Sequence, residues 1–161
     1  MRNVIVNSTP MIILSKIGRL DVLREMYGFV IVPQAVYKEV NAKSDSACQC
    51  MRGSDWIHVR NIVSIEDKKM YKARLHDGEV EVMILAQEIG GDVLTVIDDN
   101  AARKTARYLG LKVTGTLGVL MKAKSLGYIE SVKESMLSMR KSGFYISAEL
   151  ERSVLNKVGE L

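Results

Sequence analysis

The chain has 161 residues, of which 47% are hydrophobic and 26% are charged, so it has the composition of one folded domain rather than of a disordered chain. No apolar run approaches the roughly 20 residues that a membrane span needs, and the start lacks the long apolar stretch of a signal peptide, so we expect a cytoplasmic protein. The net charge of +4 and the isoelectric point of about 9.1 would help the protein to approach a polyanion such as a nucleic acid, although many soluble domains without such a partner carry a similar charge.

The first part of the chain predicts a strand, two helices, a second strand and a third helix. The strands are the apolar runs at residues 4–6 and 29–32. Helical patterns occupy residues 11–16 and 19–27, which are separated at a glycine, and residues 34–42. Pro33 is expected to open the last of these helices, because proline is favoured in a first helical turn.

The middle of the chain is less regular. Residues 42–55 form its most polar part, and we expect a mobile loop there. The run at residues 56–59 is a possible extra strand. A longer helix is expected over residues 77–89, ended by a pair of glycines, and a strongly apolar strand over residues 93–97.

The last part predicts a helix at residues 100–109, a weaker strand at residues 111–114 and a helix at residues 116–126. The tail, residues 130–161, carries two more helical patterns around Ser142-Gly143-Phe144. Because strands alternate with helices through about residue 127 and the strands are apolar on both faces, we expect an α/β fold. The prediction is one domain over residues 1–161, in which helices cover both faces of a parallel sheet of four or five strands and the C-terminal helices pack on it.

The cysteines and histidines do not predict a metal site. Cys48 and Cys50 form a C-x-C pair without a second Cys or His pair at zinc spacing, and His58 and His76 lie in different segments. We expect structural or incidental roles for all four residues.

Acidic and amide side chains fall at positions that an α/β sheet brings to one edge. Asn7 follows the first strand, and Asp98 and Asp99 follow the strand at residues 93–97. Glu39 lies about two turns into the helix after the second strand, and Glu79 lies in the first turn of a later helix. Since ligands of open α/β sheets bind beyond the carboxyl ends of the strands, these groups are candidates for one site. Such oxygen ligands suit Mg²⁺ or Mn²⁺, which can promote attack on a phosphodiester.

Each of these residues also has an ordinary structural explanation. Asp98 and Asp99 can cap the helix that follows them, and Glu79 can be a first-turn acid. Glu39 can be a solvated helix residue, and Asn7 can begin an Asx-turn. The functional interpretation therefore depends on their joint placement.

Longer stretches of the sequence resemble the PIN-domain ribonucleases, and more closely a prokaryotic branch similar to the toxins of toxin–antitoxin pairs (VapC-like). The matching stretches are VNSTPMIILSKIGRLDVL, VIVPQAVYKEV, LHDGEVEVMILAQEIG, VLTVIDDNAARKTARYLGLKVTGTLGVLMKAKSLGYI and SMRKSGFYISAELERSVLNKVGE. The combination of HDGE, IDDNAAR and TGTLGVL in this order is specific to the family. The resemblance implies a ring of acidic residues that binds Mg²⁺ or Mn²⁺ and cleaves RNA.

Carried over position by position, the resemblance implies that Asn7, Glu39, Glu79 and Asp98 are the metal ligands, in that order. Asp99 is adjacent and can share or replace the last role, and one of the two aspartates would orient or deprotonate the attacking water. The family usually has an aspartate at the position of Asn7. An amide oxygen can coordinate a hard cation but brings no charge and cannot act as a base, so we expect weaker metal binding.

The resemblance also implies that Ser8 and Thr9 are the small hydroxyl residues near the metal. Arg103, Lys104 and Arg107 are candidates for holding RNA phosphates, and the ordinary alternative for these three is a solvated helix face. By resemblance we expect a homodimer and an antitoxin partner, which the amphipathic tail can contact.

Two other functions are considered for the same residues, of which the second is disfavoured. A PIN-like module with a weakened metal site would bind RNA or a partner without cleavage. A response-regulator receiver is also an α/β fold with acidic residues, but its acidic pair usually follows the first strand, where this chain has Asn7.

Overall fold

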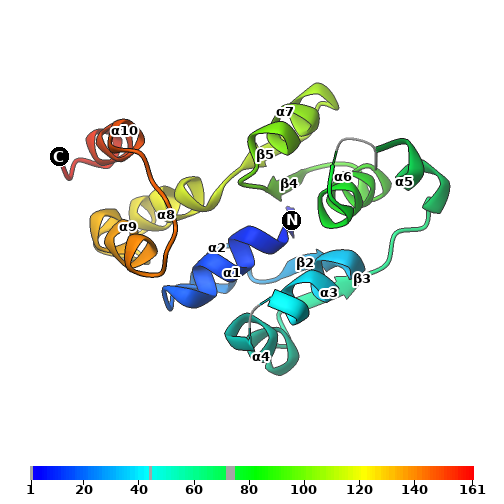
Figure 1. The fold of residues 1–161 in the computed structure, drawn as a ribbon, viewed down its shortest axis with the longest axis horizontal. Coiled ribbons are helices and arrows are strands. Elements are labelled where there is room, and N and C mark those ends of the chain that lie inside the picture. Colours follow the sequence, from blue (N-terminus) through cyan, green and yellow to red (C-terminus); the bar gives the residue numbers. More distant parts are fainter. Residues whose placement is uncertain (1, 44, 72–74) are drawn as a thin grey trace.

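The computed structural model describes residues 2–43, 45–71 and 75–161, and within them it contains a parallel sheet of five strands (Figure 1). The strands are β1 (Asn3–Val6), β2 (Val30–Pro33), β3 (Ile57–Arg60), β4 (Val93–Val96) and β5 (Lys112–Thr114). Their order across the sheet is β3-β2-β1-β4-β5, and every neighbouring pair is parallel. The predicted α/β fold is confirmed, including the two strands for which the sequence signal was weak.

Helices alternate with these strands. They are α1 (Ser8–Lys16), α2 (Asp21–Tyr27), α3 (Gln34–Lys43), α4 (Asp45–Gly53), α5 (Ile65–Tyr71), α6 (Asp77–Ile89), α7 (Asn100–Tyr108), α8 (Thr116–Ser125), α9 (Val132–Lys141) and α10 (Ala148–Val158). The last three gather on one side of the molecule, where α9 and α10 pack against α8 and against each other (Figure 1). None of the helices within the described residues is long and apolar enough to cross a membrane.

The order of the strands creates a switch point between β1 and β4. From β1 the chain adds β2 and β3 on one side, and it then returns to place β4 on the other side of β1. The two strands end level, because Val6 pairs with Val96 and the Asn7 amide donates a hydrogen bond of 3.0 Å to the Val96 carbonyl. The chain segments that leave β1 and β4 therefore run to opposite sides, and a crevice forms beyond the ends of these two strands.

The central strands are buried on both faces, as their uninterrupted apolar sequences predict. Val4, Ile5 and Val6 of β1 have no exposed surface, and neither has Val96 of β4. Each such side chain contributes about 1.5–3 kcal/mol through burial, so the short strands are held by the layers that cover them. The rigid sheet fixes the position of the residues that follow each strand.

The prediction of a mobile loop over residues 42–55 is wrong, because most of this stretch is helix α4. Ala47, Cys48 and Met51 are buried and recur at helical spacing on the face that contacts α1 and α3. Because most of the other residues in this stretch are polar, its composition did not indicate this narrow apolar stripe. Both Cys48 and Cys50 are free thiols.

The ends of other elements also differ from the prediction. Pro33 is the last residue of β2 rather than the first of α3, at a strand end where its missing amide hydrogen costs little. Helix α1 begins at Ser8, earlier than expected, because Pro10 is tolerated in a first turn whose amides need no helical partner. Helix α5 was not predicted.

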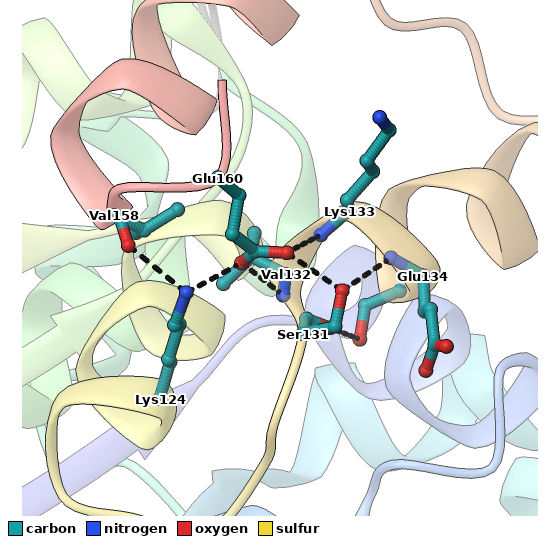
Figure 2. A network of polar contacts seen from close by, with 8 residues as sticks. Lys124, Ser131, Val132, Lys133, Glu134, Val158 and Glu160 are labelled. Atoms are coloured by element: carbon teal, nitrogen blue, oxygen red, sulfur yellow. Dashed lines mark hydrogen bonds and ion pairs between the residues drawn. The ribbon is translucent and has the colours of Figure 1, made fainter.

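The carboxylate of Glu160 attaches the end of the chain to the start of α9 (Figure 2). It accepts hydrogen bonds from Ser131 Oγ at 2.6 Å and from the amides of Val132 and Lys133 at 2.7 and 3.2 Å. The Lys124 ammonium of α8 lies 3.0 Å from its second oxygen. A negative charge at a helix N-terminus also interacts favourably with the helix dipole, so this one side chain joins α8, α9 and the C-terminus.

We predict that Glu160→Gln lowers stability at neutral pH by about 1–2 kcal/mol, because it removes the charge from these hydrogen bonds. Burial raises the pKa of the Glu160 carboxyl, but its hydrogen bonds outweigh burial and lower the pKa from 4.5 to about 2. Its contribution is therefore complete above pH 4.5 and is lost as the pH falls toward 2. Thermal unfolding between pH 7 and pH 2 should show a weaker pH dependence in the variant than in the wild type. Exposed Glu130→Gln is the control, and an equal effect there would contradict the assignment.

Candidate active site

A cavity of about 340 Å³ lies beyond the carboxyl ends of β1 and β4. Its walls come from the starts of α1, α6 and α7 and from one face of α3. The residues that line it are Asn7, Ser8, Thr9, Glu39, Lys43, His76, Glu79 and Asp99. Six of the site residues expected from the sequence are thus brought together at the switch point of the sheet.

Asn7 has a buried side-chain oxygen without a partner. The residue occupies the N-cap position of α1, but its side chain makes no capping hydrogen bond, and with its oxygen unpartnered it does not form the Asx-turn that was the structural alternative. It is 4% exposed, and its Oδ1 has no hydrogen-bond partner among the described residues. An unsatisfied buried acceptor costs about 1–3 kcal/mol. The position therefore suits an external group that interacts with the amide oxygen.

Glu39 is held on both oxygens by donors from two other helices. Ser8 Oγ at the start of α1 donates to Oε2 at 2.7 Å, and the Gly78 amide at the start of α6 donates to Oε1 at 3.0 Å. These contacts exclude the alternative of an ordinary solvated residue for Glu39. The carboxylate is fixed where three helices meet.

The glycine of the HDGE motif is required by this contact. A Cβ atom at position 78 would lie 2.8 Å from Glu39 Oε1, which is closer than a carbon and an oxygen can approach without movement. Because Gly78 has no side chain, the backbone of α6 approaches the carboxylate without displacing it.

Glu79 is 6% exposed and combines a structural contact with a place in the cavity. Its Oε1 accepts a hydrogen bond of 3.0 Å from the His76 amide, so the expectation of a first-turn acid is correct for this contact. Burial raises the pKa of Glu79 above its ordinary value of 4.5, and the His76 amide opposes this effect. The negative charges of Asp99 and Glu39 raise the pKa further. The three carboxylates are therefore close enough to repel one another.

The two consecutive aspartates have different surroundings. Asp99 lines the cavity and caps α7, because its Oδ2 accepts a hydrogen bond of 2.9 Å from the Ala102 amide. Asp98 is not among the lining residues. Its Oδ1 accepts from the Thr116 amide at 2.7 Å and its Oδ2 from Thr116 Oγ1 at 2.6 Å, so it ties the end of β4 to the start of α8.

The predicted phosphate-binding residues of α7 do not line the cavity. Arg103 Nη1 donates a 3.5 Å hydrogen bond to the Ile97 carbonyl, and it lies where a Cβ of Gly115 would be. Lys104 and Arg107 are exposed. Because α7 begins at the cavity and rises about 1.5 Å per residue, its later residues move away from the site.

Three residues that shape the site were not predicted from the sequence. Lys43 and His76 line the cavity. Glu81 is 7% exposed, its Oε1 accepts a 3.0 Å hydrogen bond from the Ala35 amide at the start of α3, and its Oε2 lies 2.7 Å from Lys68 Nζ. Glu81 thus holds α3 against α6 and keeps Glu39 beside its donors. A charged residue within the apolar sequence of α6 was the available signal for Glu81.

The described residues do not contain a group of three or more His, Cys, Asp and Glu side chains that is already closed around one metal position. The carboxylates in the cavity instead bond to donors of the protein. Their oxygens keep further lone pairs, because a carboxylate can accept about four hydrogen bonds or ligands.

We predict that Gly78→Ala lowers any activity of this site by about 10–100-fold, because the new methyl group displaces the Glu39 carboxylate and reacting groups tolerate little misplacement. Alanine favours a helix more than glycine does, and the displaced atoms are the end of a flexible side chain, so the melting temperature should change little. Thermal unfolding and activity are measured on the same sample. A large loss of stability, or full activity, would contradict this role for Gly78.

The comparisons with known proteins agree with this geometry. No curated protein matches the chain. The family model DUF3368, described as a PIN domain, matches residues 3–160 and so covers the sheet, the cavity and the C-terminal helices. PIN domains are a family of nucleases that typically bind Mg²⁺. The chain belongs to the PIN-domain family.

Proposed function

We propose that the protein is a metal-dependent ribonuclease that hydrolyses RNA phosphodiester bonds and serves as the toxin of a toxin–antitoxin pair. The nuclease proposal is carried by one observation: a single cavity is lined by Asn7, whose buried Oδ1 has no partner, and by carboxylates that include Glu79, whose charge Asp99 and Glu39 disfavour. The toxin role rests on the resemblance of the sequence to that branch of the family.

The residues of the cavity fit Mg²⁺ or Mn²⁺. Amide and carboxylate oxygens are the ligands that these hard cations prefer. A cation would interact with Asn7 Oδ1 and would reduce the repulsion that raises the pKa of Glu79. We assign Asn7, Glu39, Glu79 and Asp99 as the residues that would hold it, with Asp98 adjoining them.

A divalent ion held by these residues would supply Lewis-acid stabilisation of the charge that develops on the phosphodiester. Asp99 uses its Oδ2 to cap α7, so its Oδ1 remains available to orient the attacking water and accept a proton. Ser8 and Gly78 keep Glu39 from rotating away. Asn7 can position a ligand but cannot take up a proton.

The specific observation that favours a second function is the neutral side chain of Asn7. A site with one negative charge fewer would bind a cation more weakly, and the protein would then bind RNA or a protein partner without cleavage.

We also propose a homodimer and an antitoxin partner, as the resemblance implies. Several large apolar side chains of the C-terminal region are exposed and support such contacts. They are Leu126, Tyr128, Leu137, Tyr145, Leu150 and Leu161.

We predict that millimolar Mg²⁺ or Mn²⁺ raises the melting temperature of the wild type and has a much smaller effect on Glu79→Gln. The pKa of Glu79 is raised in the folded protein, so its favourable contribution is present below pH 4.5 and is lost as the pH rises through the raised value. Without metal, Glu79→Gln should therefore become more stable than the wild type as the pH rises to 7. The same titration of Glu130→Gln is the control. Equal stabilisation of Glu79→Gln and wild type by metal would remove Glu79 from the ligand set.

We predict that the wild type cleaves labelled RNA with Mg²⁺ or Mn²⁺, that EDTA stops the reaction, and that Asp99→Asn lowers kcat by about 10²–10⁴-fold. Asparagine is also a good N-cap, so Asp99→Asn should keep its melting temperature. Asp98→Asn should lose less activity and more stability, because Asp98 holds Thr116. Cleavage that persists in EDTA, or in Asp99→Asn, would reject the proposed mechanism.

Asn7→Asp distinguishes the two functions in the same assay. If the wild type is folded, binds RNA and does not cut it, while Asn7→Asp does, the protein is the binding module of the second proposal. If both cut, the amide is sufficient as a ligand.

A further inference from the structure

A second cavity adjoins the first and shares Glu39 with it. This smaller cavity has a volume of about 190 Å³. It is lined by Gln34, Ala35, Lys38, Glu39, Lys68, Asp77 and Glu81. Glu39 therefore lies between the two cavities, and helix α3 lines both of them.

Three lysines line the two cavities, and they differ in their partners. Lys68 Nζ lies 2.7 Å from Glu81 and 3.9 Å from Asp77, so its charge is used within the protein. Lys38 and Lys43 are exposed, and neither ammonium group has a hydrogen-bond or ion-pair partner among the described residues. These two charges are available for a ligand.

The two available lysines lie on either side of the acidic residue on the same helix. Lys38 precedes Glu39 and lines the smaller cavity, while Lys43 lies one turn beyond Glu39 and lines the larger one. A separation of five residues corresponds to about 7.5 Å along the helix axis. Positive charges thus flank the carboxylate that the proposed reaction uses.

We propose that Lys38 and Lys43 bind the phosphates on either side of the scissile phosphodiester, so that single-stranded RNA runs along α3 from one cavity to the other across Glu39. This inference rests on the proposed ribonuclease function and names the path of its substrate. Lysine binds phosphate as a point charge and tolerates different backbone geometries. Contacts to phosphate position a strand without selecting its sequence.

The test measures RNA binding without cleavage. The affinity of fluorescein-labelled single-stranded RNA is determined by anisotropy in EDTA at several KCl concentrations, for wild type, Lys38→Gln, Lys43→Gln and the double variant. Each phosphate contact on a single strand contributes about 0.7 to the slope of log affinity against log salt. We expect each single variant to reduce the slope by about 0.7 and the double variant by about 1.4.

Lys133→Gln is the matched control, because Lys133 lies in α9, lines neither cavity and extends its side chain away from the contacts around it (Figure 2). Its slope should equal that of the wild type, and Lys38→Arg and Lys43→Arg should retain the wild-type slope. Unchanged slopes in Lys38→Gln and Lys43→Gln, an equal loss in Lys133→Gln, or wild-type binding that does not depend on salt would overturn the proposal.

Cleavage of the same RNA with Mn²⁺ separates this inference from the proposed function. The lysine variants should raise KM with little change in kcat, because these contacts bind substrate and transition state alike. If the RNA is not cut but the salt slopes depend on the lysines, the nuclease proposal is rejected and the proposed RNA path is supported. If the RNA is cut but the lysine variants change neither the salt slope nor KM, the nuclease proposal is supported and the RNA path is rejected.

Discussion

The carboxylate of Glu39 is the contact on which the cavity depends. The side chain belongs to α3, and its two oxygens accept hydrogen bonds from the starts of α1 and α6. Those helices follow different strands, so one carboxylate fixes the relative positions of three connections at the edge of the sheet. The second donor is Gly78, whose backbone approaches without the methyl group that would displace the carboxylate.

Several acidic residues outside the cavity have protein donors on both oxygens, as Glu39 has within it. Both oxygens of Glu81 and of Asp98 have protein donors, and the carboxylate of Glu160 has four. In the cavity, by contrast, Asn7 Oδ1 has no partner and the charge of Glu79 is disfavoured by burial and by neighbouring carboxylates. Asn41 Oδ1 also lacks a partner, but it lines neither cavity, whereas Asn7 and Glu79 line the same one, which is typical of a site that a ligand completes.

The sheet could be predicted from the sequence because its strands are short apolar runs that alternate with helices. Helix α4 could not, because its burial depends on contacts with α1 and α3 that a polar sequence of this length does not reveal. For the site, the positions directly after strands were informative for Asn7 and for the aspartate pair. Glu81 and Lys43 were missed, because their roles depend on how α3 lies against α6 and on which lysines find partners.

The aspartate pair shows why sequence position alone does not assign a role. Consecutive residues of an extended chain direct their side chains to opposite sides, and the backbone at Asp99 is extended. After β4, only one member of the pair can therefore face the cavity. Asp98 faces the start of α8, and Asp99 faces the carboxylates. With Asn7 neutral, the cavity then holds three carboxylates, Glu39, Glu79 and Asp99, rather than four. A divalent ion would neutralise most of that charge. The acidic residues would then repel an RNA phosphate less, and Lys38 and Lys43 could bind it more readily.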